Sequence, residues 1–235
     1  MSQFKSSNTR SEAAFYNISG CPEDLFKHMI RLGAYAWELE IASTMECVTF
    51  NMDPVLAIET AIKKWSVPEF EDRPEYTVDK VPENLEAEAI DTEELAQYRQ
   101  DLHYCAEGWR YGLLLYIERV FKWRSDQTAP LKFGFLARKT LNNVRSCRRS
   151  LMLQKQLLLP VFLAGCETKD EILRQEVKEY CTWWNEETGY NMILTATGLL
   201  EEVWNDRSSD AWWGDVIDQN TRAITGPGPN QYLFG

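Results

Sequence analysis

Apolar residues recur every three or four positions along most of this chain, the spacing of one face of an α-helix. The segments with this spacing are 20–39, 53–65, 91–123, 130–149, 153–166, 168–189, 194–204 and 210–219. Several have a start or stop signal, such as Asp53-Pro54 at one beginning and Gly189 at one end. The pattern predicts an all-α protein of seven to nine helices. Glu46–Asn51 is the one short segment that alternates like a strand.

Two local signals predict details of the C-terminal half. Thr168 to Glu171 (TKDE) fits a capping box, which places a helix start at Thr168. Pro160 lies inside the apolar segment 153–166, so we expect a kink or break there.

The helical segments are arranged as a single domain with less regular flanks. We divide the chain into an N-terminal extension (1–19), a helical domain (20–220) and a C-terminal tail (221–235) rich in glycine and proline. Residues 66–90 contain three prolines among many acids and lack helical periodicity. They predict a long acidic connector inside the domain.

Composition and charge narrow the class of protein. With 44% hydrophobic residues, a net charge of −11, no apolar run of membrane-spanning length and no N-terminal apolar segment, the chain is expected to be soluble and intracellular. Residues 69–101 hold 12 acids and 3 bases, whereas residues 119–149 hold 9 bases and 1 acid. The basic stretch is a solvated helix face, a phosphate-contacting patch or a partner for the acidic connector.

Motifs for catalysis or metal binding are absent from the sequence. It has no GxGxxG, GxxxxGK[ST], GxSxG, HExxH or DDxxD pattern, and neither His28 nor His103 follows a glutamate at di-iron spacing. The 6 cysteines lie at least 15 residues apart and form no CxxC pair. We expect no metal site, no cofactor and no disulfide framework in this chain.

Tryptophans are concentrated after residue 180, where 5 of the 9 lie. Adjacent tryptophans on a helix point about 100° apart, so two such pairs cannot all face one small core. They pack between several helices, form a dimer contact or line a ligand cavity. The candidate pocket residues are Trp183, Trp184, Tyr190, Trp204, Trp212 and Trp213.

Three segments form an ordered set: 157–167 (LLLPVFLAGCE), 189–191 (GYN) and 199–204 (LLEEVW). Together with Gly20-Cys21-Pro22, they resemble the fungal-specific regulatory domain that follows the Zn(II)2Cys6 cluster in fungal transcription factors. The resemblance covers residues 15–217, and its motif core is Leu158, Pro160, Phe162, Gly165, Cys166, Leu200, Glu202 and Trp204. Since these segments are the most apolar, we predict that Leu158, Phe162, Leu199, Leu200 and Trp204 are buried.

The resemblance implies an all-α regulatory domain that, in some members, holds a small lipophilic effector among its helices. It implies that DNA is bound through a separate N-terminal domain, since the zinc cluster needs six closely spaced cysteines that this chain lacks. We expect a nuclear regulatory domain, with the cytoplasm as the alternative location, that forms a homodimer and contacts coregulator proteins. The candidate dimer surfaces are residues 119–149 and the C-terminal tryptophans. An enzyme on a helical scaffold without a recognisable motif is the alternative function.

Overall fold

In the computed structural model of the chain, residues 15–16, 19–67, 92–123, 130–149, 152–206 and 212–225 are described. Most of the predicted N-terminal extension, acidic connector and C-terminal tail lies outside these residues. The helices of the described part are α2 (Glu23–Ser43), α3 (Asp53–Lys64), α4 (Thr92–Ile117), the π-helical η1 (Glu118–Lys122), α5 (Leu131–Ser146), α6 (Met152–Lys155), α7 (Leu158–Glu167), α8 (Glu171–Thr188), α9 (Asn191–Asn205) and α10 (Trp213–Thr225).

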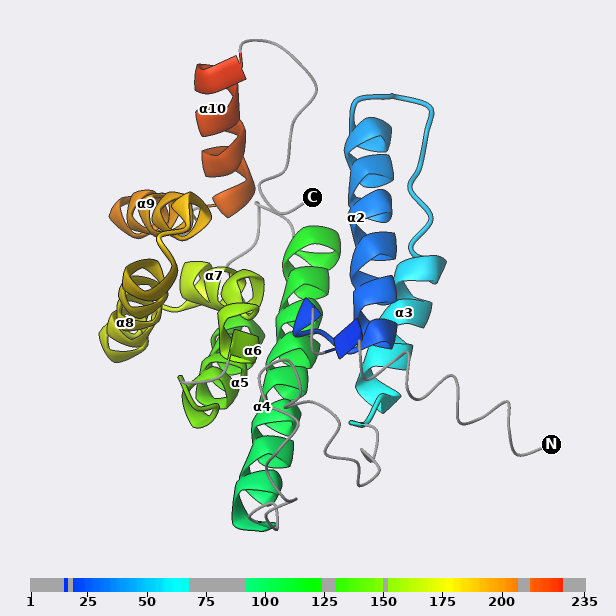
Figure 1. Cartoon of the computed structure of the whole chain (residues 1–235). Coiled ribbons are helices and arrows are strands. Elements are labelled where there is room, and N and C mark those ends of the chain that lie inside the picture. Colours follow the sequence, from blue (N-terminus) through cyan, green and yellow to red (C-terminus); the bar gives the residue numbers. More distant parts are fainter. Residues whose placement is uncertain are drawn as a thin grey trace, which may run out of the picture.

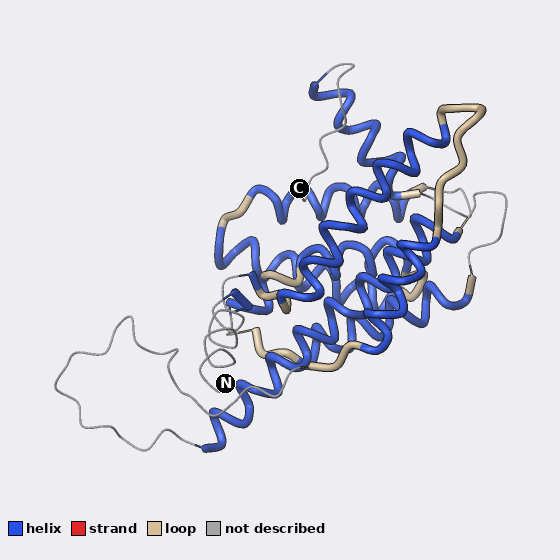
Figure 2. Tube along the Cα trace, turned by 90° about the vertical axis from the view of Figure 1, so that its right-hand side faces the viewer, coloured by secondary structure: helices blue, strands red, loops and turns tan. Residues whose placement is uncertain are grey.

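Helix α4 and its continuation η1 form the centre of the molecule (Figure 1). Helices α2 and α3 pack on one side of α4, and helices α5 and α7 pack on the other. Helices α8 and α9 contact α7 and each other, and α10 contacts α9. The trace in Figure 2 shows helices joined by loops and no strand in the described part of the chain, which confirms the all-α class.

The central position of α4 follows from the many buried residues along it. Leu102, Cys105, Leu113 and Ile117 are all buried, as expected for a helix covered on several sides. Gly112 allows α7 to approach closely, since a Cβ at this position would lie 3.1 Å from the Cβ of Pro160. The sequence motif that contains Pro160 therefore packs directly on the central helix.

Most predicted helix boundaries agree with the structure. Helix α3 begins at Asp53, and α4 with η1 spans Thr92 to Lys122 as one continuous segment. Helix α8 is followed by Gly189 in the left-handed conformation (φ 66°), which a residue without a Cβ adopts at little cost. These boundaries depend on residues that are close together in the sequence.

Three predicted details are wrong. Helix α8 is capped by Asp170 rather than Thr168: the Asp170 Oδ1 accepts from the Ile172 N–H at 2.9 Å, and Thr168 Oγ1 accepts from the Asp170 N–H. The break in segment 153–166 lies between α6 and α7, so Pro160 is the third residue of α7, where a missing N–H removes no helical bond. Residues 46–51 form a loop, because a strand requires a partner strand and the described part offers none.

Candidate functional site

The two segments of the family-like motif meet at Gly165 in α7. A Cβ on Gly165 would lie 2.8 Å from Leu200 Cδ2 of α9, so the two helices are in close contact there. The Trp204 indole N–H donates to the Gly165 carbonyl at 2.9 Å. Segments that are separate in the sequence therefore form one helix–helix contact.

The other motif residues have different environments. Leu158, Phe162, Leu199 and Leu200 are buried as predicted, whereas Cys166 is partly exposed. Trp204 is only half-buried, which corrects the prediction. Its ring lies at the edge of α8, with the Arg174 and Lys178 cationic groups 5.5 and 5.4 Å from its centroid. Exposed Glu202 accepts from the Asn220 side-chain N–H at 2.8 Å and so joins α9 to α10.

The six aromatic pocket candidates do not surround one common space. Trp184 and Trp213 are buried, Trp204 and Trp212 are partly buried, and Trp183 and Tyr190 are exposed. Each adjacent tryptophan pair is divided between a buried and a more exposed member. In α8 the helical turn separates Trp183 from Trp184, whereas Trp212 directly precedes α10. Of the six, only Trp212 and Trp213 contact each other, with ring centroids 4.5 Å apart.

Trp184 belongs to a buried polar hub at Gln154. The Trp184 indole N–H donates to Gln154 Oε1 at 3.0 Å. Gln154 Nε2 donates to the carbonyls of Val144 and Cys147, at 3.0 and 2.8 Å, where α5 ends. The Gln154 amide thus bonds the Cys147 carbonyl at the end of α5 and adds a second bond to the Val144 carbonyl, which already accepts from the Cys147 N–H. Because Trp184 donates to the same Gln154 side chain, Trp184 has a structural role.

A second group of buried and partly buried side chains surrounds Arg119 of η1, which is only 2% exposed. Its guanidinium carbon lies 3.9 Å from the ring centroid of Trp123 and 5.1 Å from that of Trp212, and its Nε is 3.0 Å from Glu167 Oε1. We call this group the Arg119 junction; it consists of Tyr116, Arg119, Trp123, Phe133, Phe162, Glu167, Trp212 and Trp213. The ion pair and the aromatic faces together compensate the desolvation of the buried cation.

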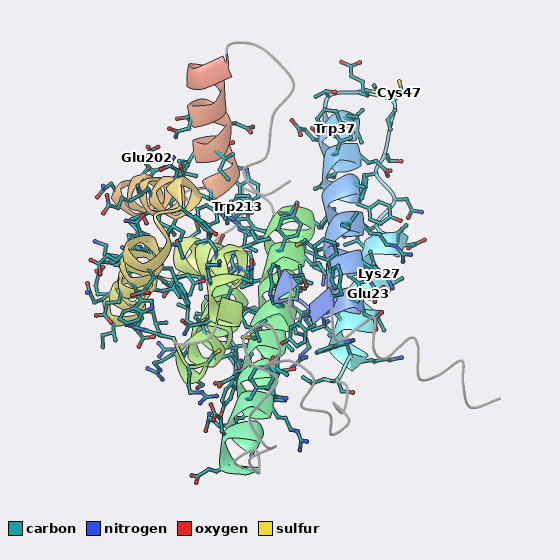
Figure 3. The ribbon with its side chains drawn as sticks, viewed as in Figure 1. Glu23, Lys27, Trp37, Cys47, Glu202 and Trp213 are labelled. Carbon is teal, nitrogen blue, oxygen red and sulfur yellow. The ribbon has the colours of Figure 1, made fainter. Side chains whose placement is uncertain are left out.

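Trp213 forms the side of the Arg119 junction contributed by α10 (Figure 3). Its ring centroid is 6.2 Å from that of Tyr116 and 6.3 Å from that of Phe162. Burial raises the pKa of Tyr116 to about 12, so its phenol is neutral at physiological pH. Among the described residues, the buried Trp213 indole N–H has no hydrogen-bond partner. The junction therefore combines apolar rings with one unused donor.

Trp212 and Trp213 were predicted from the sequence as pocket residues, whereas Arg119 was not. A signal was present: Tyr116, Arg119 and Trp123 are three and four residues apart, so they fall on one helical face. A cation on such an aromatic face is a candidate for burial. Gln154 was also missed, and its neighbours in the sequence do not reveal its role.

A pocket of about 210 Å³ lies between α5, α7 and α8. Its lining residues are Leu141, Val144, Arg145, Arg149, Gln154, Val161, Glu176, Val177, Glu179 and Tyr180, and none of the six aromatic candidates is among them. Its volume is below the ~300 Å³ at which small-molecule sites usually begin. The Arg145–Glu176 ion pair, at 2.8 Å, belongs to this pocket, so part of its charge is already neutralised.

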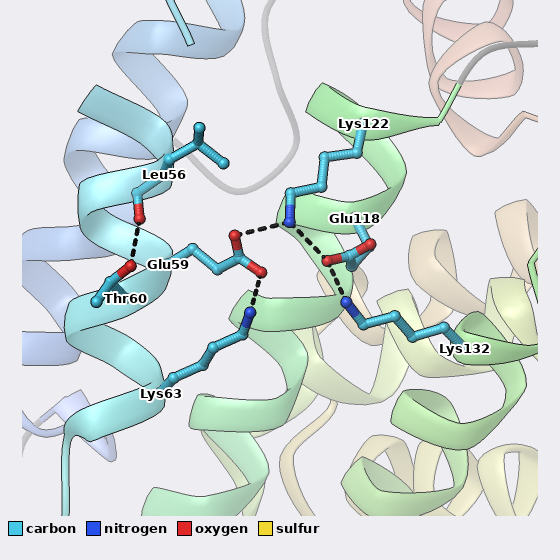
Figure 4. Close-up of polar contacts among 7 residues, drawn as sticks. All are labelled: Leu56, Glu59, Thr60, Lys63, Glu118, Lys122 and Lys132. Atoms are coloured by element: carbon cyan, nitrogen blue, oxygen red, sulfur yellow. Dashed lines mark hydrogen bonds and ion pairs between the residues drawn. The ribbon is translucent and has the colours of Figure 1, made fainter. Parts of the chain in front are cut away.

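The basic stretch 119–149 is largely paired with acids elsewhere in the domain. Its ion pairs are Arg119–Glu167, Lys122–Glu59, Lys122–Glu118, Lys132–Glu118, Arg138–Asp170, Arg145–Glu176, Arg148–Asp101 and Arg149–Glu179. Figure 4 shows the part of this network that joins α3, η1 and α5. These partners lie in α3, α4, η1, α7 and α8, or cap α8. Acids within the described domain therefore neutralise part of the charge of the basic stretch. Nearly all of the acidic connector lies outside the described residues, so its pairing with the basic stretch stays a prediction.

Burial raises the pKa of several cysteine thiols. Cys105 and Cys147 are both buried, with their Sγ atoms 3.3 Å apart, and the contact with Cys147 together with burial raises the Cys105 pKa well above its ordinary value.

In the described part of the chain, no group of three or more His, Cys, Asp or Glu residues is arranged to hold a metal. None of the described helices combines the length and apolarity that crossing a bilayer requires.

Comparison with known proteins places this chain in a family. The model of the fungal specific transcription factor domain matches residues 1–225. The chain therefore belongs to the family of fungal specific transcription factor domains, which confirms the resemblance drawn from its motifs. No curated protein and no solved structure matches it.

Proposed function

We propose a specific regulatory function for this chain, starting from the role in transcription that its family membership supports. We propose that it is the regulatory and dimerisation part of a nuclear regulator that contacts DNA through a separate N-terminal Zn(II)2Cys6 domain. The observation that carries this proposal is the family match over residues 1–225. The net charge of −11 also favours a separate DNA-binding domain, since an acidic chain is repelled by the phosphate backbone of DNA.

A tethering experiment tests the regulatory role. The chain is fused to an unrelated DNA-binding domain, and transcription of a reporter carrying its site is measured. We expect the intact fusion to change reporter output, by itself or through coregulator proteins. The matched control carries Leu200→Asp, which puts a charge into a fully buried position and removes the fold. Equal output from both fusions and from the DNA-binding domain alone would contradict the proposal.

The isolated chain provides a second test. In a gel-shift assay at physiological salt, we expect no sequence-dependent DNA binding by the chain alone. A fusion that adds an N-terminal zinc cluster domain should bind DNA. A specific shift by the isolated chain would show that it contacts DNA itself.

The Arg119 junction is the proposed site for a small apolar effector. It offers aromatic surface and the unpartnered indole N–H of Trp213, which together suit an apolar molecule with one hydrogen-bond acceptor. Its buried cation is already paired with Glu167, so the junction is suited to binding rather than to catalysis. The proposal needs α10 to move enough to admit the ligand, because the rings are in contact.

Tryptophan fluorescence titrated with sterols and fatty acids tests the effector site. Trp213→Phe keeps an aromatic ring and removes the donor, so affinity should fall by about threefold to tenfold, the worth of one hydrogen bond. The matched control Trp183→Phe changes an exposed ring outside the junction and should leave affinity unchanged. If no ligand changes the fluorescence or the melting temperature of the parent chain, the effector proposal fails.

A further inference from the structure

Helix α2 has apolar residues on two opposite sides. Its inner side carries Leu25 and Leu32, both fully buried, and partly buried Leu39. Its outer side carries Ile30, Trp37 and Ile41, which are 57%, 44% and 37% exposed, and the exposed Ala34. We call Ile30, Ala34, Trp37 and Ile41 the outer stripe. A surface helix with one buried side needs no second apolar side for its own domain.

The outer stripe has the spacing of a helix–helix seam. Its residues follow one another at steps of four, three and four, which keeps them within about 60° on one face of the helix. The stripe is about 16 Å long, from the rise of 1.5 Å per residue. Helix α2 lies at the edge of the molecule, packed against α3, α4 and η1 (Figure 1), and the labelled Trp37 stands far along it from Glu23 (Figure 3). An exposed apolar strip of this kind marks a contact surface.

The charged residues beside the stripe indicate which partner fits. Arg31 and Glu38 are exposed and flank the stripe on the same side, seven residues apart. Two copies of α2 in antiparallel orientation would bring the Arg31 of one copy next to the Glu38 of the other, twice by symmetry. A parallel arrangement would place Gly33 opposite Glu38 and Glu40 opposite Met45, which provides no charge pair. The stripe is therefore self-complementary in the antiparallel orientation only.

Side-chain size agrees with this orientation. In the register that places Ile30 opposite the partner's Ile41, small Ala34 lies opposite the partner's Trp37. Arg31 is then offset from the partner's Glu38 by two residues, about 3 Å along the helix axis, which its long side chain can span. Pairing a small with a large residue fills each layer of a helix pair without overpacking. We propose that the outer stripe of α2 is the dimer interface, in which it packs antiparallel against the α2 of a second copy. This inference rests on the dimerisation proposed above and assigns it to a surface other than residues 119–149 or the C-terminal tryptophans.

Light scattering on the whole chain at tens of micromolar tests the interface. The parent chain should have about twice the 27.3 kDa mass of one chain. Trp37→Glu should give the monomer mass with an unchanged circular dichroism spectrum, because the residue is exposed. The matched control Ile172→Glu changes an apolar residue of α8 that is 72% exposed and should stay dimeric. A monomeric parent overturns both the dimer and this interface, whereas a dimer that persists in Trp37→Glu overturns the interface alone.

Charge exchange tests the charge pairs across the interface. Arg31→Glu and Glu38→Arg should each raise the dissociation constant at least tenfold, and the double variant should restore it, because both pairs are recreated with reversed charge. A double variant as weak as the single ones overturns the assignment.

Cysteine cross-linking tests the orientation. In a Cys47→Ser background, oxidation should cross-link a mixture of Ile30→Cys and Ile41→Cys chains but neither variant alone. In the antiparallel register, two Ile30 positions are about 16 Å apart, too far for a disulfide. Cross-linking of one variant with itself would show a parallel pair and overturn the orientation. A monomeric parent that Trp37→Glu destabilises would show that another part of the same chain covers the stripe, which also overturns the proposal.

Discussion

Gly165 is the motif residue whose replacement should be most informative. A Cβ added there would lie 2.8 Å from Leu200 Cδ2 and 3.2 Å from Val177 Cγ1. Both neighbours are 1% exposed, so neither side chain can turn into solvent to make room. Alanine at this position therefore separates α7 from α8 and α9 or forces a poor rotamer.

Two opposing effects set the size of the change. Alanine is favoured over glycine inside a helix by about 1 kcal/mol. Overpacking a filled core costs about 1–3 kcal/mol. We therefore expect Gly165→Ala to lower the free energy of unfolding by about 1 kcal/mol, with a melting temperature about 2–4 °C lower in a chain of this size.

Gly198 of α9 provides the matched control. It is an exposed helical glycine with no atom within 4 Å of the position where a Cβ would lie. Gly198→Ala should therefore stabilise the protein, by about 0.5–1 kcal/mol. Thermal and urea unfolding followed by circular dichroism would measure both variants.

The sign of the difference decides the outcome. If Gly165→Ala is stabilised as much as Gly198→Ala, the close contact at Gly165 does not limit packing and the reasoning is wrong. A double-mutant cycle adds a check: the loss caused by Gly165→Ala should shrink in a Leu200→Ala background, because the clashing methyl group is gone.

Three further predictions concern buried polar groups and thiols. Gln154→Leu should lower the free energy of unfolding by about 2 kcal/mol or more in urea titrations, because it leaves the Trp184 N–H and the Cys147 carbonyl buried without the Gln154 partner. Burial alone would raise the Glu59 pKa, but the ammonium groups of Lys122 and Lys63 outweigh it and lower that pKa. The ionised carboxylate of Glu59 is therefore favoured in the folded state, and its contribution to stability should be lost as the pH falls below about 4. Melting curves recorded at several pH values should show a smaller loss of stability at low pH in Glu59→Gln than in the parent chain. In maleimide labelling followed by mass spectrometry, exposed Cys47 should react first, whereas the buried Cys105, whose pKa is raised, should need denaturant; early labelling of Cys105 would contradict this.

The positions of the helices could be predicted because the responsible signals are local. Helical spacing, the start at Asp53 and the left-handed Gly189 all involve residues within a few positions of one another. The incorrect predictions also concern residues that are close together in the sequence. Asp170 competes with Thr168 to cap the start of α8, and Pro160 is tolerated in the first turn of α7. A single sequence does not rank such neighbouring alternatives.

The candidate site could be predicted only in part. The cluster of C-terminal tryptophans directed attention to Trp212 and Trp213, which do belong to the Arg119 junction. The junction also needs Arg119 from η1 and Glu167 from α7. Contacts between residues 48 positions apart carry no local pattern, so no periodicity could reveal this ion pair.

By itself, the sequence determined the helices, the all-α class and the family, because each depends on short segments and their order. Only the tertiary structure decided which member of each tryptophan pair is buried, which acids neutralise the basic stretch, and which apolar side of α2 stays exposed. Those outcomes depend on how the helices pack, and packing balances burial against desolvation across the whole domain. An apolar residue such as Trp37 has the same pattern in the sequence whether its own core or a second molecule covers it.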